Sequence, residues 1–252
     1  MNNIKTLFNP SDGQELSTQQ MLSLIGLAAL AAAAISWMPI INWLDYPFRL
    51  LLTIVHELGH GLAAILTGGS FRNFIIAPDG SGLAYTAGGW RLVVIPAGYL
   101  GAAIFAAGLI MLGRSHRWSR IALGGIGAAM LLLSLWFGLP GEASIQAVVS
   151  SALGMVTGVI FGIIFLKIAL QAGDGLVIFF LHLVAIKAGF TAFSDLVAVI
   201  GLSTRLGPVP HTDAHSMAEL THIPAVFWGL VWAATALALI GGAIWVTWLK
   251  SD

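Results

Sequence analysis

Seven apolar stretches, each close to the length that crosses a lipid bilayer, follow one another along this chain. A transmembrane helix needs about 20 predominantly apolar residues. The stretches lie at 22–44, 48–67, 91–112, 119–138, 145–169, 175–202 and 224–249. Because 175–202 is long for one helix and short for two, the pattern predicts six or seven spans. Charged residues make up only 9% of the chain, against about 25% in soluble domains, so we expect an all-α polytopic membrane protein.

Little of the chain is left over outside these spans. Residues 1–21 are polar, so we expect a polar N-terminal tail at 1–21 and a single transmembrane domain at 22–252. The formal net charge is zero and indicates no nucleic-acid partner. The absence of cysteine excludes disulfides and a Cys-ligated metal. We expect the lipid bilayer to be a plasma or inner membrane, with a thylakoid or organelle membrane as the alternative.

One segment, 68–90, does not have the pattern of a span. Asp79-Gly80 is a turn signal between two short apolar runs, so we predict a β-hairpin directly after the second span. It is either a plain connection or an edge strand that binds an extended substrate by β-augmentation. For the second interpretation the expected substrate-binding residues are Phe74, Ile75 and Ile76.

Within the second apolar stretch, residues 56–60 read His56-Glu57-Leu58-Gly59-His60. On a helix, residues four apart lie on one face, so both imidazoles can reach one metal ion and Glu57 can act as the base. An ionisable residue at the bilayer centre costs about 2.5–3.5 kcal/mol, so three of them in five positions indicate a use. The structural alternative is that two core histidines and a buried carboxylate hydrogen-bond to one another and bind no metal.

A catalytic zinc takes three protein ligands and keeps one open position, so His56 and His60 need a third partner from elsewhere. Asp195 lies in an otherwise apolar stretch, where a carboxylate is a functional candidate by default. Asp213 and His215 lie in a polar cluster that we interpret as a loop. We therefore favour Asp195, with Asp213 as the alternative third ligand and His215 after it.

The position of Asp195 carries a further expectation. If 175–202 were one straight helix, Asp195 would lie near its outer end while His56 lies near mid-membrane. We therefore expect a break near Gly189 that lets Asp195 approach the metal. Lys187 and His182 share this segment, and we interpret both as structural: Lys187 either snorkels or pairs with a carboxylate, and His182 packs.

Small residues at a spacing of four mark the segment 145–169. Gly154, Gly158 and Gly162 form a ridge that lets helices approach closely. Internal packing is the favoured interpretation. A homodimer through Gly154, Gly158 and Gly162 is the alternative.

Taken in order, these motifs resemble those of the site-2 protease family of intramembrane zinc metallopeptidases, in particular its short, single-domain branch without a PDZ domain. The pieces that carry the resemblance cover residues 50 to about 235. They are His56–Gly61, the turn and hairpin at 68–90, Ala97–Gly101, Ser194-Asp195-Leu196, and Thr212–Ala214 followed by Leu220-Thr221 and Pro224.

The resemblance implies one zinc ion held by His56, His60 and an aspartate, with Glu57 catalytic. It implies an endopeptidase that cuts a membrane-embedded protein substrate, with the hairpin helping to present it. The alternative function is a catalytically inactive homologue that acts as a membrane chaperone or assembly factor. A transporter ranks last, since no inverted repeat or interrupted-helix pair stands out.

Overall fold

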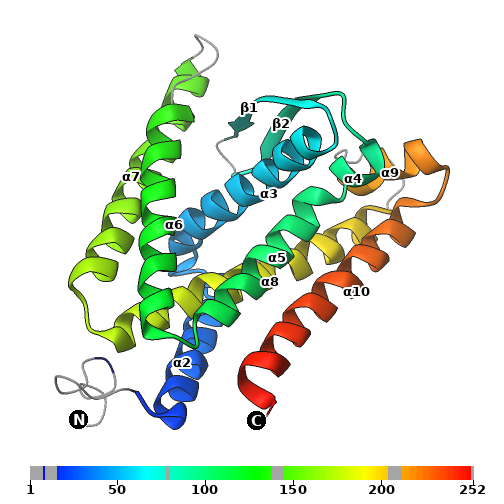
Figure 1. The fold of residues 1–252 in the computed structure, drawn as a ribbon. Helices are drawn as coiled ribbons and strands as arrows, with labels where there is room; N and C mark the ends of the chain where they lie inside the picture. Colours follow the sequence, from blue (N-terminus) through cyan, green and yellow to red (C-terminus); the bar gives the residue numbers. More distant parts are fainter. Residues whose placement is uncertain (1–7, 9–15, 78–79, 138–144, 204–211, 251–252) are drawn as a thin grey trace. The chain divides into compact units, whose positions relative to one another are not determined.

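The computed structural model is built from helices and one two-stranded hairpin (Figure 1). It describes residues 8, 16–77, 80–137, 145–203 and 212–250, and the side chains at 42, 137, 145–151 and 192–203 lie outside that description. The expected all-α class with a hairpin after the HExxH helix is confirmed. The elements are α2 (Thr18–Trp37), the 3₁₀ helix η1 (Asn42–Asp45), α3 (Tyr46–Leu66), β1 (Ser70–Ile76), β2 (Gly82–Ala87), α4 (Arg91–Val94), α5 (Ala97–Leu112), α6 (His116–Phe137), α7 (Ile145–Gln171), α8 (Asp174–Ser203), α9 (Asp213–Thr221), α10 (Ala225–Ile244) and the π-helical turn η2 (Trp245–Leu249).

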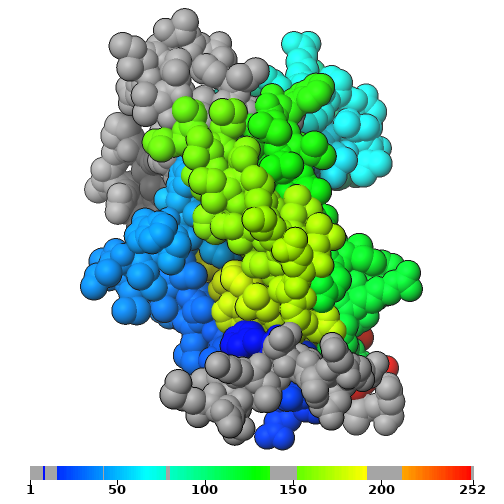
Figure 2. All heavy atoms as spheres, turned by 90° about the vertical axis from the view of Figure 1, so that its left-hand side faces the viewer, coloured from blue at the N-terminus to red at the C-terminus, as the bar shows by residue number. Residues whose placement is uncertain are grey.

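Six helices in the described part of the chain are long and apolar enough to cross a membrane, namely α2, α3, α6, α7, α8 and α10 with η2. The apolar helix α5 is shorter. Side chains of α7, coloured yellow-green, cover the middle of the face in Figure 2. Most of the exposed large side chains of α7 are apolar, among them Leu153, Val156, Ile160 and Ile163, whereas the exposed polar ones, Lys167 and Gln171, lie near its end. An apolar exposed helix face suits contact with lipid, so the chain has the character of a multi-pass membrane protein.

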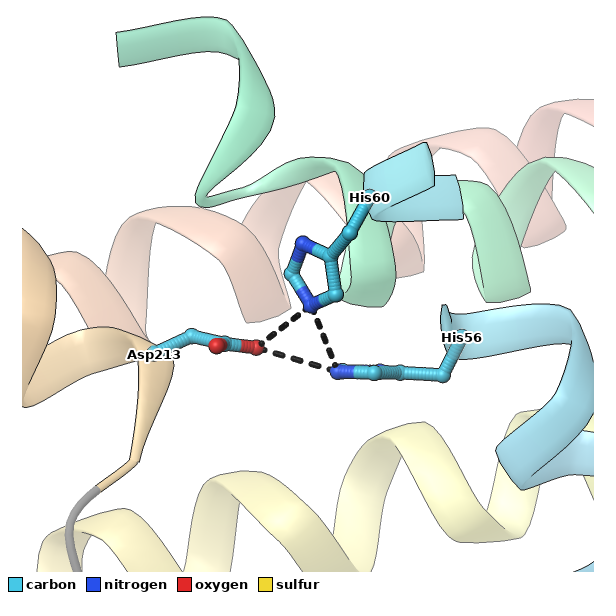
Figure 3. A group of neighbouring side chains, drawn as sticks. All are labelled: His56, His60 and Asp213. Atoms are coloured by element: carbon cyan, nitrogen blue, oxygen red, sulfur yellow. Dashed lines mark hydrogen bonds and ion pairs between the residues drawn. The ribbon is translucent and has the colours of Figure 1, made fainter. Parts of the chain in front are cut away.

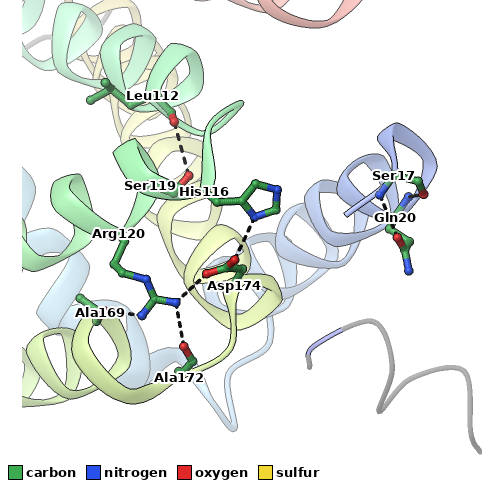
Figure 4. A network of polar contacts seen from close by, with 9 residues as sticks. All are labelled: Ser17, Gln20, Leu112, His116, Ser119, Arg120, Ala169, Ala172 and Asp174. Atoms are coloured by element: carbon green, nitrogen blue, oxygen red, sulfur yellow. Dashed lines mark hydrogen bonds and ion pairs between the residues drawn. The ribbon is translucent and has the colours of Figure 1, made fainter. Parts of the chain in front are cut away.

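The first span begins at a capping box. The Ser17 hydroxyl accepts a hydrogen bond from the Gln20 backbone N–H (3.3 Å), and the Gln20 side-chain oxygen accepts one from the Ser17 N–H (2.9 Å; Figure 4). Two backbone donors that helix geometry leaves unpaired are thereby satisfied. Helix α2 therefore begins at Thr18, inside the segment that we assigned to the polar tail.

The contacts divide the chain into two compact units. Unit 1 contains 1–51, 76–81 and 108–187, and unit 2 contains 52–75, 82–107 and 188–252. Helices α3, α5 and α8 have residues in both units. A single transmembrane domain at 22–252 stays a prediction.

Two predicted spans need correction. The span 91–112 is interrupted, because Pro96 has no N–H to donate and separates α4 from α5. The expected break near Gly189 is not there: α8 runs as one helix from Asp174 to Ser203. Glycine weakens a helix interior by only about 0.5–1 kcal/mol relative to alanine, which does not by itself end a helix.

Within unit 1 the glycine ridge of α7 packs against α6. A Cβ added at Gly162 would come within 2.9 Å of the Gly127 carbonyl oxygen, and one at Gly158 would overlap the Ser134 hydroxyl. The bare backbone is what allows this approach. Internal packing is therefore confirmed for Gly158 and Gly162, and a homodimer through the ridge stays only a prediction.

A buried ion pair lies in unit 1. The Lys187 ammonium donates to the Ser36 hydroxyl (2.7 Å) and to the Asp45 carboxylate. The Lys187 side chain is buried, and Arg49 Nε lies 3.5 Å from the second Asp45 oxygen. Pairing with a carboxylate, one of the two roles that we predicted for Lys187, is confirmed. We call Lys187, Asp45 and Ser36 the lysine cluster.

A second polar network joins the ends of three unit 1 helices (Figure 4). The Arg120 guanidinium donates to the Ala169 carbonyl (2.6 Å), the Ala172 carbonyl (2.9 Å) and the Asp174 carboxylate (2.6 Å), and His116 Nδ1 lies 3.3 Å from the same carboxylate. Carbonyls at the end of a helix lack intrahelical donors. Arg120 supplies them at the end of α7 and ties that end to the start of α8.

Candidate metal centre

Helix α3 carries the HExxH motif and places both histidines on one face, as the spacing predicts. The Nε2 atoms of His56 and His60 lie 3.0 Å apart, with the two rings in an edge-to-face arrangement. His60 is buried and His56 is partly exposed. The two imidazoles therefore point their Nε2 atoms at one common position.

Asp213 completes the group from the far end of the sequence (Figure 3). Its Oδ2 lies 3.0 Å from His56 Nε2 and 3.2 Å from His60 Nε2. All three residues belong to unit 2. Among the described residues, this is the group whose ligand atoms lie close enough together to hold a metal ion. We call His56, His60 and Asp213 the histidine–aspartate cluster.

The protons of this cluster show why a cation fits there. His60 Nδ1 donates its hydrogen to the Val94 carbonyl (2.7 Å), so the Nε2 of a neutral His60 ring carries a lone pair. That lone pair faces the Asp213 carboxylate, and two acceptors at this distance repel unless a proton or a metal ion lies between them. A tetrahedral zinc with bonds of about 2.0–2.2 Å separates its N and O ligands by roughly 3.3–3.5 Å. The observed separations of 3.0, 3.0 and 3.2 Å are a few tenths of an ångström shorter than this, and the donor set suits such an ion.

The Val94 carbonyl is available to His60 because a helix ends there. Helix α4 stops at Val94, and Pro96 separates it from α5. A carbonyl at a helix end takes side-chain donors, and a carbonyl partner on the second ring nitrogen orients a metal-binding histidine. Our interpretation of the sequence missed this contact, although Pro96 inside an apolar stretch was a signal for it.

Glu57 lies beside the same cluster but on the hairpin side. Its side chain is buried, and it lies close enough to His56, His60 and Asp213 to interact with each electrostatically. The backbone amide of Ala84 in β2 also interacts with the Glu57 carboxylate. The position thus suits a base that acts next to the metal without ligating it.

Gly82 explains how the hairpin comes so close to Glu57. A Cβ at Gly82 would overlap the carboxylate of Glu57 and the methyl group of Thr53. Bare backbone at this position therefore lets β2 lie directly against α3.

The three residues that we predicted to bind substrate lie on the other strand. On β1, Phe74 is buried and stacks on Phe71, whereas Ile75 is exposed and Ile76 is intermediate. Phe74 is thus a packing residue in this structure, and the strand beside Glu57 is β2. Alternation along a strand points neighbouring side chains to opposite faces, which explains why their exposures differ. Substrate binding by Phe74, Ile75 and Ile76 stays a prediction.

The third-ligand expectation divides in two. Asp195 lies in α8, and its side chain is outside the described residues, so Asp195 as a ligand stays a prediction. The structure brings Asp213, the alternative, to the histidines. His215 is not in that group, and its Nδ1 lies 2.9 Å from the Thr212 hydroxyl.

We had expected the polar cluster around Asp213 to be a loop, but in the structure Asp213 begins the helix α9. Thr212 is its N-cap residue, and Asp213 lies in its first turn, where a negative charge is favourable. Ala214 and Met217 are buried at a spacing of three, which gives the short helix an apolar side. That side anchors α9 and so holds Asp213 in place.

The apolar side of α9 packs in a cluster of buried side chains in unit 2. Its buried members are Ile95, Ala214, Met217, Ala225 and Trp232, with Tyr99 and Trp228 packed against them. The Tyr99 ring stacks on Trp232 (centroids 5.5 Å apart) and meets the His56 ring edge to face (4.9 Å). The Tyr99 side chain therefore contacts a histidine of α3 and also packs against the apolar cluster that holds α9, the helix that carries Asp213.

The environment keeps Asp213 ionised. Burial acts to raise the pKa of Asp213, but its interactions with the His56 and His60 rings outweigh this effect and hold that pKa well below its usual range. Asp213 is therefore an anion, whether a proton or a metal ion lies between its carboxylate and the Nε2 atoms. The cluster therefore offers a carboxylate and two imidazoles, which are the ligands that zinc accepts when no cysteine is present.

The fold and the site together define a polytopic helical membrane protein with an HExxH metal-site pattern. A family model described as Peptidase M50B-like matches residues 26–243, and the chain belongs to this family. Neither the curated proteins nor the solved structures contain a match. The family membership agrees with the resemblance to site-2 proteases that the motifs carry.

Proposed function

We propose that this protein is an intramembrane zinc-dependent endopeptidase that hydrolyses peptide bonds of membrane-embedded protein substrates. The observation that carries the proposal is the convergence of His56, His60 and Asp213 on one position, with Glu57 beside it. Membership of the M50B-like peptidase family supports it. A plasma or inner membrane remains our expectation for its location.

The residues divide the chemistry between them. His56, His60 and Asp213 would hold one zinc ion, which supplies Lewis-acid activation of water and of the substrate carbonyl. Glu57 takes the proton from the attacking water and passes it to the leaving amine. The Val94 carbonyl fixes the tautomer of His60, so that its Nε2 is free to bind.

The hairpin provides a way to present the substrate. Carbonyls in a transmembrane helix are already hydrogen-bonded within the helix, so the scissile bond has to leave the helix before water can attack it. A strand edge offers replacement hydrogen bonds to the unwound segment. Because β2 lies against Glu57 through Gly82 and Ala84, a segment bound to this hairpin would enter the site as an extended chain.

The alternative is an inactive homologue that serves as a membrane chaperone or assembly factor. The present site does not favour it, because a complete set of donors and a buried Glu57 are all in place.

Two measurements on purified protein in detergent test the proposal. The wild type should carry about one zinc per chain. Glu57→Gln should keep this metal, and cleavage of labelled single-span transmembrane peptides in liposomes should fall by about 10²–10⁴-fold, as expected when a general base is lost. Glu219→Gln on α9 is the matched control, because Glu219 is exposed. Wild-type protein without zinc, or a Glu57→Gln variant with full cleavage, would overturn the proposal.

A further inference from the structure

The first turn of α5 lies directly against the histidines. A Cβ added at Gly98 would overlap the Nε2 atoms of both His56 and His60. Gly98 is buried, and all three residues belong to unit 2. The space that a side chain at 98 would take is therefore the space on which the two imidazoles converge.

This close approach rests on a second glycine, which is inside the HExxH motif. A Cβ at Gly59 would overlap the Ala97 carbonyl oxygen and would lie 3.3 Å from the Gly98 Cα. The bare backbone of α3 at Gly59 thus lets the start of α5 come up to the histidines. Both glycines are needed for the two backbones to meet at this depth.

At the other glycines of α5 a side chain would fit without a close contact. A Cβ at Gly101 would meet the Gly59 Cα at 3.5 Å, an ordinary contact, and one at Gly108 would meet nothing within 4 Å. Helix propensity favours alanine over glycine. The exclusion of a side chain at Gly98 therefore comes from the metal site and not from α5.

We propose that Gly98, because it has no side chain, reserves the space beside the two Nε2 atoms for the metal ion and its open coordination position. A catalytic zinc has to keep one coordination position free for water or substrate. Gly98 has only hydrogen where another residue would place a Cβ atom against the Nε2 atoms of His56 and His60. The inference rests on the proposed function, because the metal is what fills the reserved space.

The first experiment measures zinc affinity in detergent by competition with a chelating dye. Gly98→Ala should bind zinc at least tenfold more weakly than the wild type, whereas Gly101→Ala and Gly108→Ala should bind it equally well. If the wild type binds no zinc, the proposed function fails. If the wild type binds zinc and Gly98→Ala binds it with the same affinity, only the present inference fails.

The second experiment needs neither metal nor activity. In metal-free protein, Gly98→Ala should lower the melting temperature. The loss should shrink or vanish when the histidine rings are removed in a His56→Ala/His60→Ala background, because the overlapping atoms are gone. This comparison remains informative if Gly98→Ala fails to fold alone, since recovery in the ring-deleted background supports the inference. An equal loss of melting temperature in both backgrounds, or failure to fold in both, overturns it.

Discussion

Two polar clusters with buried members lie in this protein, one in each unit, and they differ in how their charges balance. The lysine cluster in unit 1 contains its own cation, because Lys187 donates to both of its partners. The histidine–aspartate cluster in unit 2 brings the Asp213 carboxylate against two imidazole nitrogens, and the Nε2 of His60 is an acceptor when that ring is neutral, because its Nδ1 hydrogen goes to the Val94 carbonyl.

The difference shows that burial of polar groups inside a membrane helix does not by itself mark a site. Lys187 is more deeply buried than His60, yet its cluster is complete without any added ion. The histidine–aspartate cluster instead needs a proton or a metal ion between the His60 Nε2 and the Asp213 carboxylate. The balance of donors and acceptors, and not burial, is therefore what distinguishes a binding site from a structural pair.

The largest expected effect is on metal binding. Asp213→Asn should remove bound zinc almost entirely, because the amide is neutral and a poor zinc ligand. Lys187→Met should leave zinc at about one per chain if its cluster is only structural. Metal content of the purified variants measures both. Asp195→Asn belongs in the same series: if it loses zinc while Asp213→Asn keeps it, the third ligand is Asp195.

The next effect concerns stability and should be confined to the other cluster. Lys187→Met leaves the Asp45 carboxylate buried without its main partner, which should lower the free energy of unfolding by about 3 kcal/mol. Replacing both partners, as in Lys187→Met/Asp45→Leu, should restore most of this loss, since an apolar pair carries no desolvation cost. Denaturation in mixed micelles gives the values. A double variant as unstable as the single one would contradict a role limited to charge pairing.

Variants of the two clusters should also differ in how their melting temperature responds to zinc. Zinc at about 100 times its dissociation constant stabilises a protein that binds it only in the folded state by about 2.7 kcal/mol. We therefore expect the melting temperature of the wild type to rise with zinc and to fall with a chelator. Asp213→Asn should respond to neither, whereas Lys187→Met, although less stable, should keep the full response. A response in Asp213→Asn equal to that of the wild type would show that zinc binds elsewhere.

The smallest effect is expected at the Arg120 network (Figure 4). The Arg120 and Asp174 side chains are more exposed than those of Lys187 and Asp45. Arg120→Lys keeps the charge but loses the fork that reaches two carbonyls and Asp174 at once. Because the pair is partly exposed, we expect a loss of about 1 kcal/mol in the free energy of unfolding. Arg117→Lys on the same helix is the control, since Arg117 is exposed. Equal effects for the two variants would mean that the contacts of Arg120 contribute nothing.

Much of the fold could be predicted because its signals are local. The spans follow from runs of apolar residues, the hairpin from a turn signal between two short runs, and the histidine pair from a spacing of four on one helix. Each of these patterns lies within one continuous stretch of the chain. Short-range geometry decides them whatever the rest of the chain does.

The remaining features of the site depend on contacts between distant segments. Asp213 is 157 residues from His56, and its position follows from the packing of α9 through Ala214 and Met217. The sequence favoured Asp195 because a carboxylate in an apolar stretch stands out, whereas a carboxylate in a polar cluster does not. No local pattern records that the polar cluster folds into a helix over the histidines.

The sequence alone therefore determined that this is a multi-pass membrane protein with two histidines on one face of a helix, at the spacing of a metal site, and a hairpin beside them, since periodicity and turn chemistry act over short stretches of chain. Only the tertiary structure decided that Asp213 lies beside them, which strand lies against Glu57, and how closely Gly98 approaches the two rings. Those three features depend on how closely separate backbones approach. That distance is set by the combined packing of many side chains, and no single stretch of sequence contains it.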